Sequence, residues 1–349
     1  MKHTITATMA LMMALMLGGC SSDNEGSADN GSGMKTITLD IPIDIYSASG
    51  TLTGSKATAQ QGDPGVSTEF KAPLWLYIVA FVSENGGADC EVLTKTLQWT
   101  DADVEDDWTK QNEGQRDERW RKNVRVTFNI SRTFNNVAGL SRVFAIASRT
   151  DLSALLPTDV TSYTTMTQVE DMTIDLTGYT SEQLGDIYST PAYDRSNPVE
   201  STDNGVVESN GTTLTCSTVK LYHAAAKADF TWEVEAGLRI STELKSITCT
   251  GLPTTCKIFK PTENPAGTAT STILGAAADN AAYTVSEGNK WTGRAYAYVL
   301  QPPTPGTLSY TVAYGGTAGR ANTTSAMTPA TASFSKVFTG WYRVAATVK

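Results

Sequence analysis

The stretch that decides the fold is TITLDIPIDI, residues 36–45. Every second residue is a large aliphatic one, so five apolar side chains share one face: Ile37, Leu39, Ile41, Ile43 and Ile45. Strict alternation with a period of two is typical of a half-buried β-strand. Proline has no amide hydrogen to donate to a ladder, so Pro42 predicts that this strand lies at a sheet edge.

Further strand patterns follow, separated by turns rich in Gly, Pro and Asn. The run LWLYIVAFV at 74–82 is continuously apolar and predicts a core strand. One short helix is expected within 161–171, capped by Thr161 or Ser162. Short strands between turns, without a long amphipathic helix, indicate an all-β chain of two β-sandwiches. The other strand candidates lie near 91–99, 124–130, 142–147, 214–221, 228–234, 239–249, 295–301, 307–314 and 331–348.

Length and composition agree with two domains. The chain has 349 residues, 40% of them hydrophobic, and a typical domain takes roughly 100–200 residues. The polar, turn-rich stretch around 194–213 predicts the boundary, which gives domains at 36–208 and 209–349. The net charge of −9 excludes the basic surface that a nucleic-acid binder needs, so no nucleic-acid partner is expected.

The first residues predict where the protein is anchored. Residues 1–19 read as a signal peptide, since Lys2 precedes an apolar run too short to span a bilayer permanently. The sequence LGGC at 17–20 resembles the bacterial lipobox, which implies that Cys20 is acylated and becomes the new N-terminus. Residues 20–35 form a polar Gly/Ser-rich segment, expected to be a flexible tether. Its acidic residues resemble the tails of surface-exported lipoproteins of certain Gram-negative anaerobes; the alternative is a spacer on the periplasmic side.

Once Cys20 is lipidated, four cysteines remain: Cys90, Cys216, Cys249 and Cys256. Four cysteines allow three pairings. Cys249 and Cys256 flank the Gly/Pro turn at 250–255, so a disulfide could close across a hairpin and stabilise it by roughly 2–3 kcal/mol. The alternative is a set of free buried thiols.

The sequence offers little catalytic chemistry. His3 leaves with the signal peptide, and His223 lies in the apolar context LYHAAA, where a core or edge histidine is expected. Ser217 and Lys220 match S-x-x-K, but on a strand residues i and i+3 point to opposite faces, so the match is interpreted as chance. No catalytic residue, metal site or cofactor is therefore predicted.

Two features leave a binding role open. The acidic run DADVEDD at 101–107 lacks the glycine and glutamate that an EF-hand loop needs, so a solvated loop is expected; the alternative is a cation site of another kind. Trp99, Trp108 and Trp120 flank this charged stretch; burial is the preferred interpretation, and exposure would allow them to stack on sugars.

Taken in order, these segments resemble the fimbrillins, the major-fimbrial-subunit superfamily that builds type V pili. The resemblance rests on the lipobox, the alternating strand, the run at 74–82, and three later segments: VFAIAS at 143–148, VKLYHAAAKA at 219–228 and GWYRV at 340–344. It implies two tandem transthyretin-like Greek-key β-sandwich domains and a lipoprotein exposed on the cell outer membrane. In polymerising members a protease cuts the loop after the first strand, and the freed groove accepts a donor strand from another subunit.

The resemblance carries over to particular residues. Ile37 to Ile45 would be the removable strand, and Lys56 followed by Ala57 best matches the processing site, since the first arginine of the chain is Arg116. Without a donor extension after the last strand, an anchor, tip or accessory subunit is favoured over a stalk subunit. The expected partners are other fimbrial subunits, the outer membrane through the lipid on Cys20, and a host protein or glycan. The competing hypothesis is a non-polymerising surface lipoprotein that binds glycans.

Overall fold

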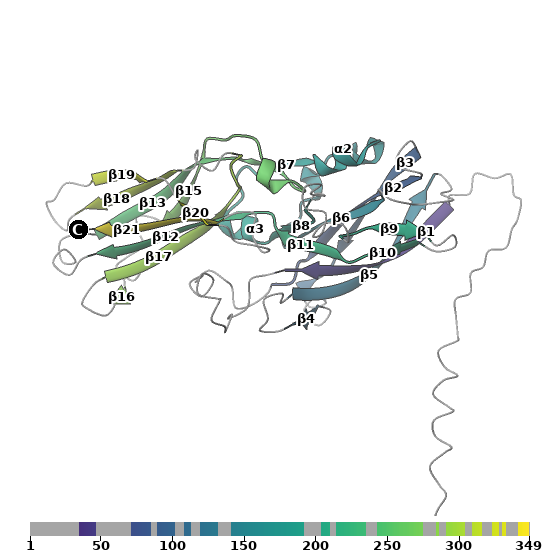
Figure 1. Ribbon diagram of the computed structural model, residues 1–349, viewed down its shortest axis with the longest axis horizontal. Coiled ribbons are helices and arrows are strands. Elements are labelled where there is room, and N and C mark those ends of the chain that lie inside the picture. The colour runs from purple at the N-terminus through teal and green to yellow at the C-terminus, as the bar shows by residue number, and fades with distance from the viewer. Residues whose placement is uncertain are drawn as a thin grey trace, which may run out of the picture. The chain divides into compact units, whose positions relative to one another are not determined.

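The computed structural model describes fifteen stretches within residues 35–349, and most of them contain β-strands (Figure 1). The predicted signal peptide, Cys20, most of the tether, Lys56 and Ala57 lie outside the described residues. The described ranges are 35–46, 71–84, 89–101, 108–112, 119–131, 141–191, 204–209, 214–234, 243–274, 284–285, 291–303, 309–315, 323–327, 330–332 and 341–348.

The first sandwich is built from one eight-stranded sheet of order β3-β2-β6-β8-β11-β1-β5-β4. A single core joins side chains from the β2–β6 side and from the β1–β5 side, so the two parts of the sheet face each other. The strands are β1 (Lys35–Ile45), β2 (Trp75–Glu84), β3 (Asp89–Gln98), β4 (Thr109–Gln111), β5 (Arg119–Ile130), β6 (Arg142–Ser148), β8 (Ile187–Ser189) and β11 (Val219–His223).

Strand β1 is not at the edge of this sheet, so the prediction drawn from Pro42 is wrong. It lies between β5, which pairs antiparallel with all eleven of its residues, and β11, which runs parallel to it. The ladder with β11 covers only Ile43–Ile45 and begins one residue after Pro42. An inner strand can contain this proline because, among the described residues, the ladder with β11 is formed by Ile43–Ile45 and does not include residue 42.

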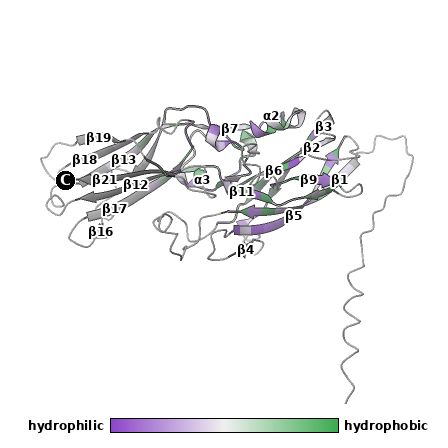
Figure 2. Ribbon diagram, in the orientation of Figure 1, coloured by the Kyte–Doolittle hydropathy of each residue, from purple (hydrophilic) through white to green (hydrophobic). Residues whose placement is uncertain are grey.

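Strand β2 explains why the run at 74–82 is apolar throughout. Leu76, Ile78 and Ala80 face the core shared with β1, while Tyr77 and Val79 face a second core on the opposite side of the strand. Residues between 152 and 187, which include a short helix, lie over this second core, and we call them the cover of the first sandwich. Residues 256–259 also pack against the second core. The predicted core strand is therefore confirmed, and it lacks alternation because both of its faces are buried. Along β5, covered on one face, Figure 2 shows apolar and polar residues alternating.

The predicted short helix is confirmed, but the predicted capping residue is wrong. Helix α2 (Met166–Glu170) is capped by Thr165, whose hydroxyl accepts from the Gln168 amide while the Gln168 side chain accepts from the Thr165 amide. Such a capping box needs a glutamine or glutamate three residues after the cap. Thr161 and Ser162 belong instead to the 3-10 helix η2 (Val160–Ser162). The cover also contains η1 (Ser153–Leu155), β7 (Thr173–Asp175) and α3 (Ser181–Gly185).

The second sandwich consists of a five-stranded sheet, β16-β17-β12-β21-β20, and a four-stranded sheet, β15-β13-β18-β19. Phe230 of the first and Tyr310 of the second are buried with ring centroids 5.9 Å apart, so the sheets pack face to face. The all-β fold class is thus confirmed. The strands are β12 (Ala226–Val234), β13 (Glu243–Leu252), β15 (Ala269–Leu274), β16 (Thr284–Val285), β17 (Trp291–Val299), β18 (Ser309–Gly315), β19 (Thr323–Met327), β20 (Ala330–Ala332) and β21 (Trp341–Val348).

The strands just after the predicted domain boundary pair with the first sandwich. β11 is an inner strand of its sheet, and Leu214 and Cys216 pack against its core. These two residues belong to β10 (Leu214–Cys216), which forms a two-stranded sheet with β9 (Val207–Ser209). By pairing, the first sandwich extends to His223, and β12 begins the second at Ala226.

The predicted disulfide between Cys249 and Cys256 is contradicted, because the structure has both as free, buried thiols. The two residues do not lie on paired strands. Cys249, in β13, is opposite Ser271 and Tyr310, whereas Cys256, in β14 (Thr255–Lys257), is opposite Ile174 of β7. The Gly/Pro turn sends the chain to a different sheet instead of closing a hairpin. Cys216 is likewise outside any disulfide, and the Cys90 thiol donates to the Thr164 carbonyl at 3.1 Å.

Candidate functional site

The candidate functional site is strand β1 together with the slot that it fills. Four of the five aliphatic residues are completely buried, namely Leu39, Ile41, Ile43 and Ile45, and Ile37 is partly buried against the same core. The predicted apolar face is therefore confirmed. That the strand can be removed stays a prediction.

Apolar side chains from three directions line the slot. In the antiparallel register with β5, Ile37, Leu39 and Ile41 lie opposite Phe128, Val126 and Val124. Leu76 and Ile78 of β2 belong to the same core, as do Val219 and Leu221 of β11. Because these side chains surround the inward face of β1, only an extended segment that is apolar at every second position could replace it.

The outward face of β1 is polar and carries a buried charge at its end. Asp44 is 1% exposed, and its carboxylate oxygens lie 2.6 Å from Arg121 Nε, 2.7 Å from Arg121 Nη2 and 2.8 Å from Arg119 Nε. The hydrogen bonds that Arg121 donates to Asp44 raise the pKa of Arg121 above its usual value. Charge-assisted and two-pronged contacts of this kind hold a strand in one register. Asp40 meets Arg125 at 3.0 Å, but both side chains are mostly exposed, so that pair contributes little.

The three tryptophans lie near the same end of the first sandwich. Trp108 is 4% exposed and belongs to the core, while Trp99 and Trp120 are partly buried against it. Lys122 points toward the core with its ammonium group 4.6 Å from the centre of the Trp99 ring. The preferred interpretation, burial, is confirmed for Trp108, which has no open face on which a sugar could stack, and only in part for Trp99 and Trp120.

The residues that resembled catalytic groups have structural roles. Ser217 Oγ accepts from the Val206 amide at 2.8 Å, and Lys220 lies on β11, so the S-x-x-K match is not carried by a helix. His223 is buried, and burial together with the charge of Lys227 lowers its pKa to about 3. Within the described ranges, no cluster of residues suited to hold a metal ion is found. The acidic run at 101–107 lies outside them beyond Asp101.

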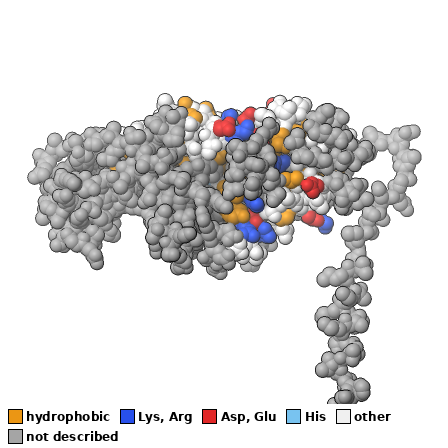
Figure 3. All heavy atoms as spheres, viewed as in Figure 1, with side chains coloured by type: hydrophobic (Ala, Val, Ile, Leu, Met, Phe, Trp, Pro, Cys, Tyr) orange, Lys and Arg blue, Asp and Glu red, His pale blue; other side chains and the backbone are white. Residues whose placement is uncertain are grey.

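Charged side chains on the described surface occur in mixed groups. On the face shown in Figure 3, basic and acidic side chains lie next to one another in small clusters. Ion pairs such as Lys71–Glu182 at 3.0 Å and Arg149–Asp101 at 2.5 Å fit this pattern. No helix in the described part of the chain is long and apolar enough to cross a membrane.

Sequence reasoning missed two parts of this site. The parallel neighbour β11 could not be found, because Val219–His223 carries no mark of its partner. The buried carboxylate had a signal: Asp44 is on the polar face of β1, and Arg119, Arg121 and Arg125 alternate along β5. Opposite charges at every second position of two strands are what a paired polar face requires.

Comparison with known proteins gives distant structural neighbours only. No family model matches the chain, and no curated protein matches it. A solved structure described as a "putative cell adhesion protein" from Bacteroides fragilis is 13% identical and covers 89% of this chain and 93% of its own, with a TM-score of 0.37. A "putative adhesin" from Bacteroides thetaiotaomicron is 10% identical, covering 84% and 80%, with a TM-score of 0.33. The major pilin of Streptococcus pyogenes is 7% identical, covering 91% and 100%, with a TM-score of 0.22.

Proposed function

We propose that this chain is a non-enzymatic structural subunit of a cell-surface fimbrium used in adhesion. In this proposal it is exported as a lipoprotein, held at the outer membrane through Cys20, and joined to other subunits by β-strand complementation. The observation that carries the proposal is the burial of β1: one amphipathic strand near the start of the chain completes a sandwich core and its ladder.

The energetics of β1 support an exchangeable strand. Burying Leu39, Ile41, Ile43 and Ile45 contributes about 6–12 kcal/mol before the cost of ordering the segment is subtracted. If the strand leaves, the lining of the slot and the backbone groups of β5 are exposed to water. An extended segment with the same alternation restores both the burial and the ladder, which is the physical basis of strand addition.

The chain around β1 also fits processing. Residues 47–70 separate β1 from the next described residues, so a cut between Lys56 and Ala57 would leave β1 held by non-covalent contacts alone. The subunit role, whether anchor, tip, accessory or stalk, follows from which strand occupies the slot in the assembled fimbrium. The competing hypothesis is a glycan binder with Trp108 or Trp120 as the stacking platform. Its support is weaker, since Trp108 is buried and Trp120 is partly buried against the same core.

The proposal is tested by exchange of β1. A recognition sequence for a site-specific protease is placed at Lys56–Ala57, the chain is cut, and a fluorescent peptide of residues 36–46 is added. The peptide should replace β1 and remain bound through gel filtration. A chain lacking 36–46 should associate or lose stability, and the peptide should reverse this.

Two variant peptides separate burial from simple charge effects. Leu39→Asp with Ile43→Asp places two carboxylates in an apolar slot and should abolish binding. The matched control, Thr36→Asp with Thr38→Asp, places the same charges on the exposed face and should still bind. Equal behaviour of the two peptides, or a stable monomeric deletion chain that ignores the wild-type peptide, would refute strand complementation.

A further inference from the structure

We infer that the fold resists tension between its two ends, and we call the arrangement a shear clamp. The first described strand, β1, pairs in parallel with β11, and the last, β21, pairs in parallel with β12. β11 and β12 are consecutive strands of the chain. Tension between the two ends of the folded part would then load both ladders along their length. This inference goes beyond the proposed function, because it holds equally for a surface protein that never polymerises.

The first ladder joins β1 to β11. Ile43, Asp44 and Ile45 lie opposite Val219, Lys220 and Leu221 in parallel register, and the Tyr46 amide donates to the Leu221 carbonyl at 3.0 Å. In a parallel pair, the start of one strand and the end of the other lie at opposite ends of the ladder. A pull between Lys35 and His223 therefore acts along the strands, and the eleven-residue ladder with β5 resists the same movement.

The second ladder joins β12 to β21 and is longer. Eight consecutive pairs, from Lys227 opposite Trp341 to Val234 opposite Val348, run in parallel. A pull between Ala226 and Val348 again acts along the strands, so the hydrogen bonds are stretched together. Were the strands pulled from the same end, the bonds would break one at a time.

The link between the two ladders is short and buried. Only Ala224 and Ala225 separate β11 from β12; they are 2% and 1% exposed, and the Ala224 amide donates to the Ile187 carbonyl at 2.9 Å. The His223 ring lies 4.5 Å from the ring of Tyr188 and 5.8 Å from that of Tyr298. The link therefore passes tension directly from one ladder to the next instead of acting as a free hinge.

A contact outside the link also joins the two sandwiches. The Tyr298 amide of β17 donates to Ser181 Oγ of α3 at 2.7 Å, and the Tyr298 ring occupies the space that a side chain at Gly185 would need. Because α3 belongs to the cover of the first sandwich, this contact stiffens the joint on a second side.

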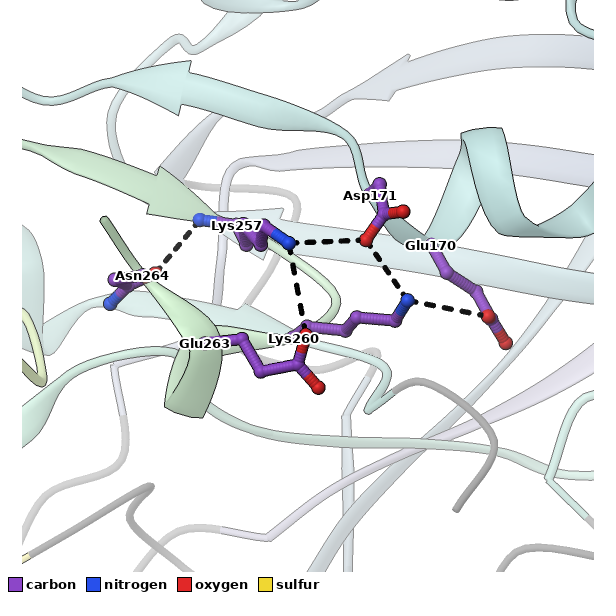
Figure 4. Close-up of polar contacts among 6 residues, drawn as sticks. All are labelled: Glu170, Asp171, Lys257, Lys260, Glu263 and Asn264. Carbon is purple, nitrogen blue, oxygen red and sulfur yellow. Dashed lines mark hydrogen bonds and ion pairs between the residues drawn. The ribbon is translucent and has the colours of Figure 1, made fainter. Parts of the chain in front are cut away.

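The third connection is an ion-pair cluster shown in Figure 4. Strand β14 pairs with β7 of the first sandwich's cover, and beside this ladder Lys260 Nζ lies 2.9 Å and Lys257 Nζ 3.3 Å from Asp171 Oδ1. Hydrogen bonds from the two lysines lower the pKa of Asp171, with that from Lys260 the larger. Asn264 accepts from the Lys257 amide at 2.8 Å and donates to the Gln301 carbonyl at 3.0 Å.

The clamp is tested by single-molecule force spectroscopy on the full mature chain with Cys20→Ser. One handle is attached at Lys349, the other through an azide-bearing residue at position 34, and the unfolding force is measured at a fixed loading rate. In the comparison chain the second handle is moved to position 47, directly after β1. The end of β1 nearest the link is then pulled, and β1 peels from β11 one pair at a time.

The chain with handles at 34 and 349 should unfold at roughly twofold higher force or more than the comparison chain, because its ladder bonds share the load. Both chains should have the same urea midpoint, so the difference reports geometry and not stability. Equal unfolding forces would overturn the clamp, as would an early low-force step in which β1 detaches from the first chain. Neither result would bear on strand complementation, which the peptide experiment tests separately.

Discussion

Replacing Leu39 by alanine tests whether β1 is part of the core. Leu39 is fully buried in the middle of β1 and lies opposite Val126 of β5. The substitution removes three carbon groups, worth about 2.4 kcal/mol of transfer free energy at about 0.8 kcal/mol each. The cavity left between the two parts of the sheet adds to this, so the free energy of unfolding should fall by about 3–4 kcal/mol.

The assay is equilibrium unfolding in urea, followed by tryptophan fluorescence. The midpoint should fall while the slope of the transition stays the same, since the surface exposed on unfolding hardly changes. Thr38→Ala is the matched control: Thr38 is the neighbouring residue on the exposed face, and its hydroxyl meets that of Thr127 at 3.0 Å. Thr38→Ala should lower the free energy of unfolding by about 0.5 kcal/mol or less.

A fall of about 1 kcal/mol or less in the free energy of unfolding of Leu39→Ala, or one no larger than that of Thr38→Ala, would contradict a core position for β1. Residues 35–46 would then be a tether lying against the sandwich, and a strand whose loss opens a slot would have no physical basis in this chain.

Four further tests concern Asp44, His223, the two buried cysteines and Cys20. Asp44→Asn should lower the free energy of unfolding by about 1–3 kcal/mol, since two arginines lose a buried carboxylate. Asp40→Asn, at an exposed ion pair, should change it by about 0.5 kcal/mol or less, and equal losses in urea unfolding would contradict this expectation. Burial lowers the pKa of His223 to about 3, so the unfolded chain binds the extra proton and stability should fall as the pH drops from about 6.5 toward 3; urea midpoints of His223→Gln should show a shallower fall, and an unchanged slope would argue against it. Burial raises the pKa of Cys249 and Cys256 to about 12, so iodoacetamide should modify both only after unfolding, and peptide mapping that finds them linked would contradict the free thiols. Cys20→Ser should release the protein from the membrane fraction, and unchanged fractionation would remove the lipoprotein hypothesis.

The strands whose burial leaves a pattern could be predicted well. Alternation at 36–45 predicted which residues of β1 face the core, and the continuous apolar run at 74–82 predicted a core strand. Both signals are local: a strand covered on one face alternates, and a strand covered on both does not. The buried histidine could be predicted from its apolar neighbours in the same way.

Features that depend on a partner strand could not be predicted from one segment of the sequence. Pro42 predicts an edge strand, but β11 joins β1 only after the proline, so the missing amide hydrogen does not affect the ladder with β11. Cys249 and Cys256 are close in sequence, yet the turn between them leads from one sheet to another. Sequence distance predicts spatial contact only when the strands on both sides of a turn pair with each other.

Residue type and period alone were enough to predict the all-β class and the apolar face of β1. Only the tertiary structure decided that β11 and β12 hold β1 and β21 in parallel, that Asp44 is buried between two arginines, and that residues 255–264 contact the cover of the first sandwich. The physical reason is that a backbone ladder is formed by groups that every residue carries. Which strands pair in one ladder therefore depends on how the whole chain buries its apolar faces, and not on any segment alone.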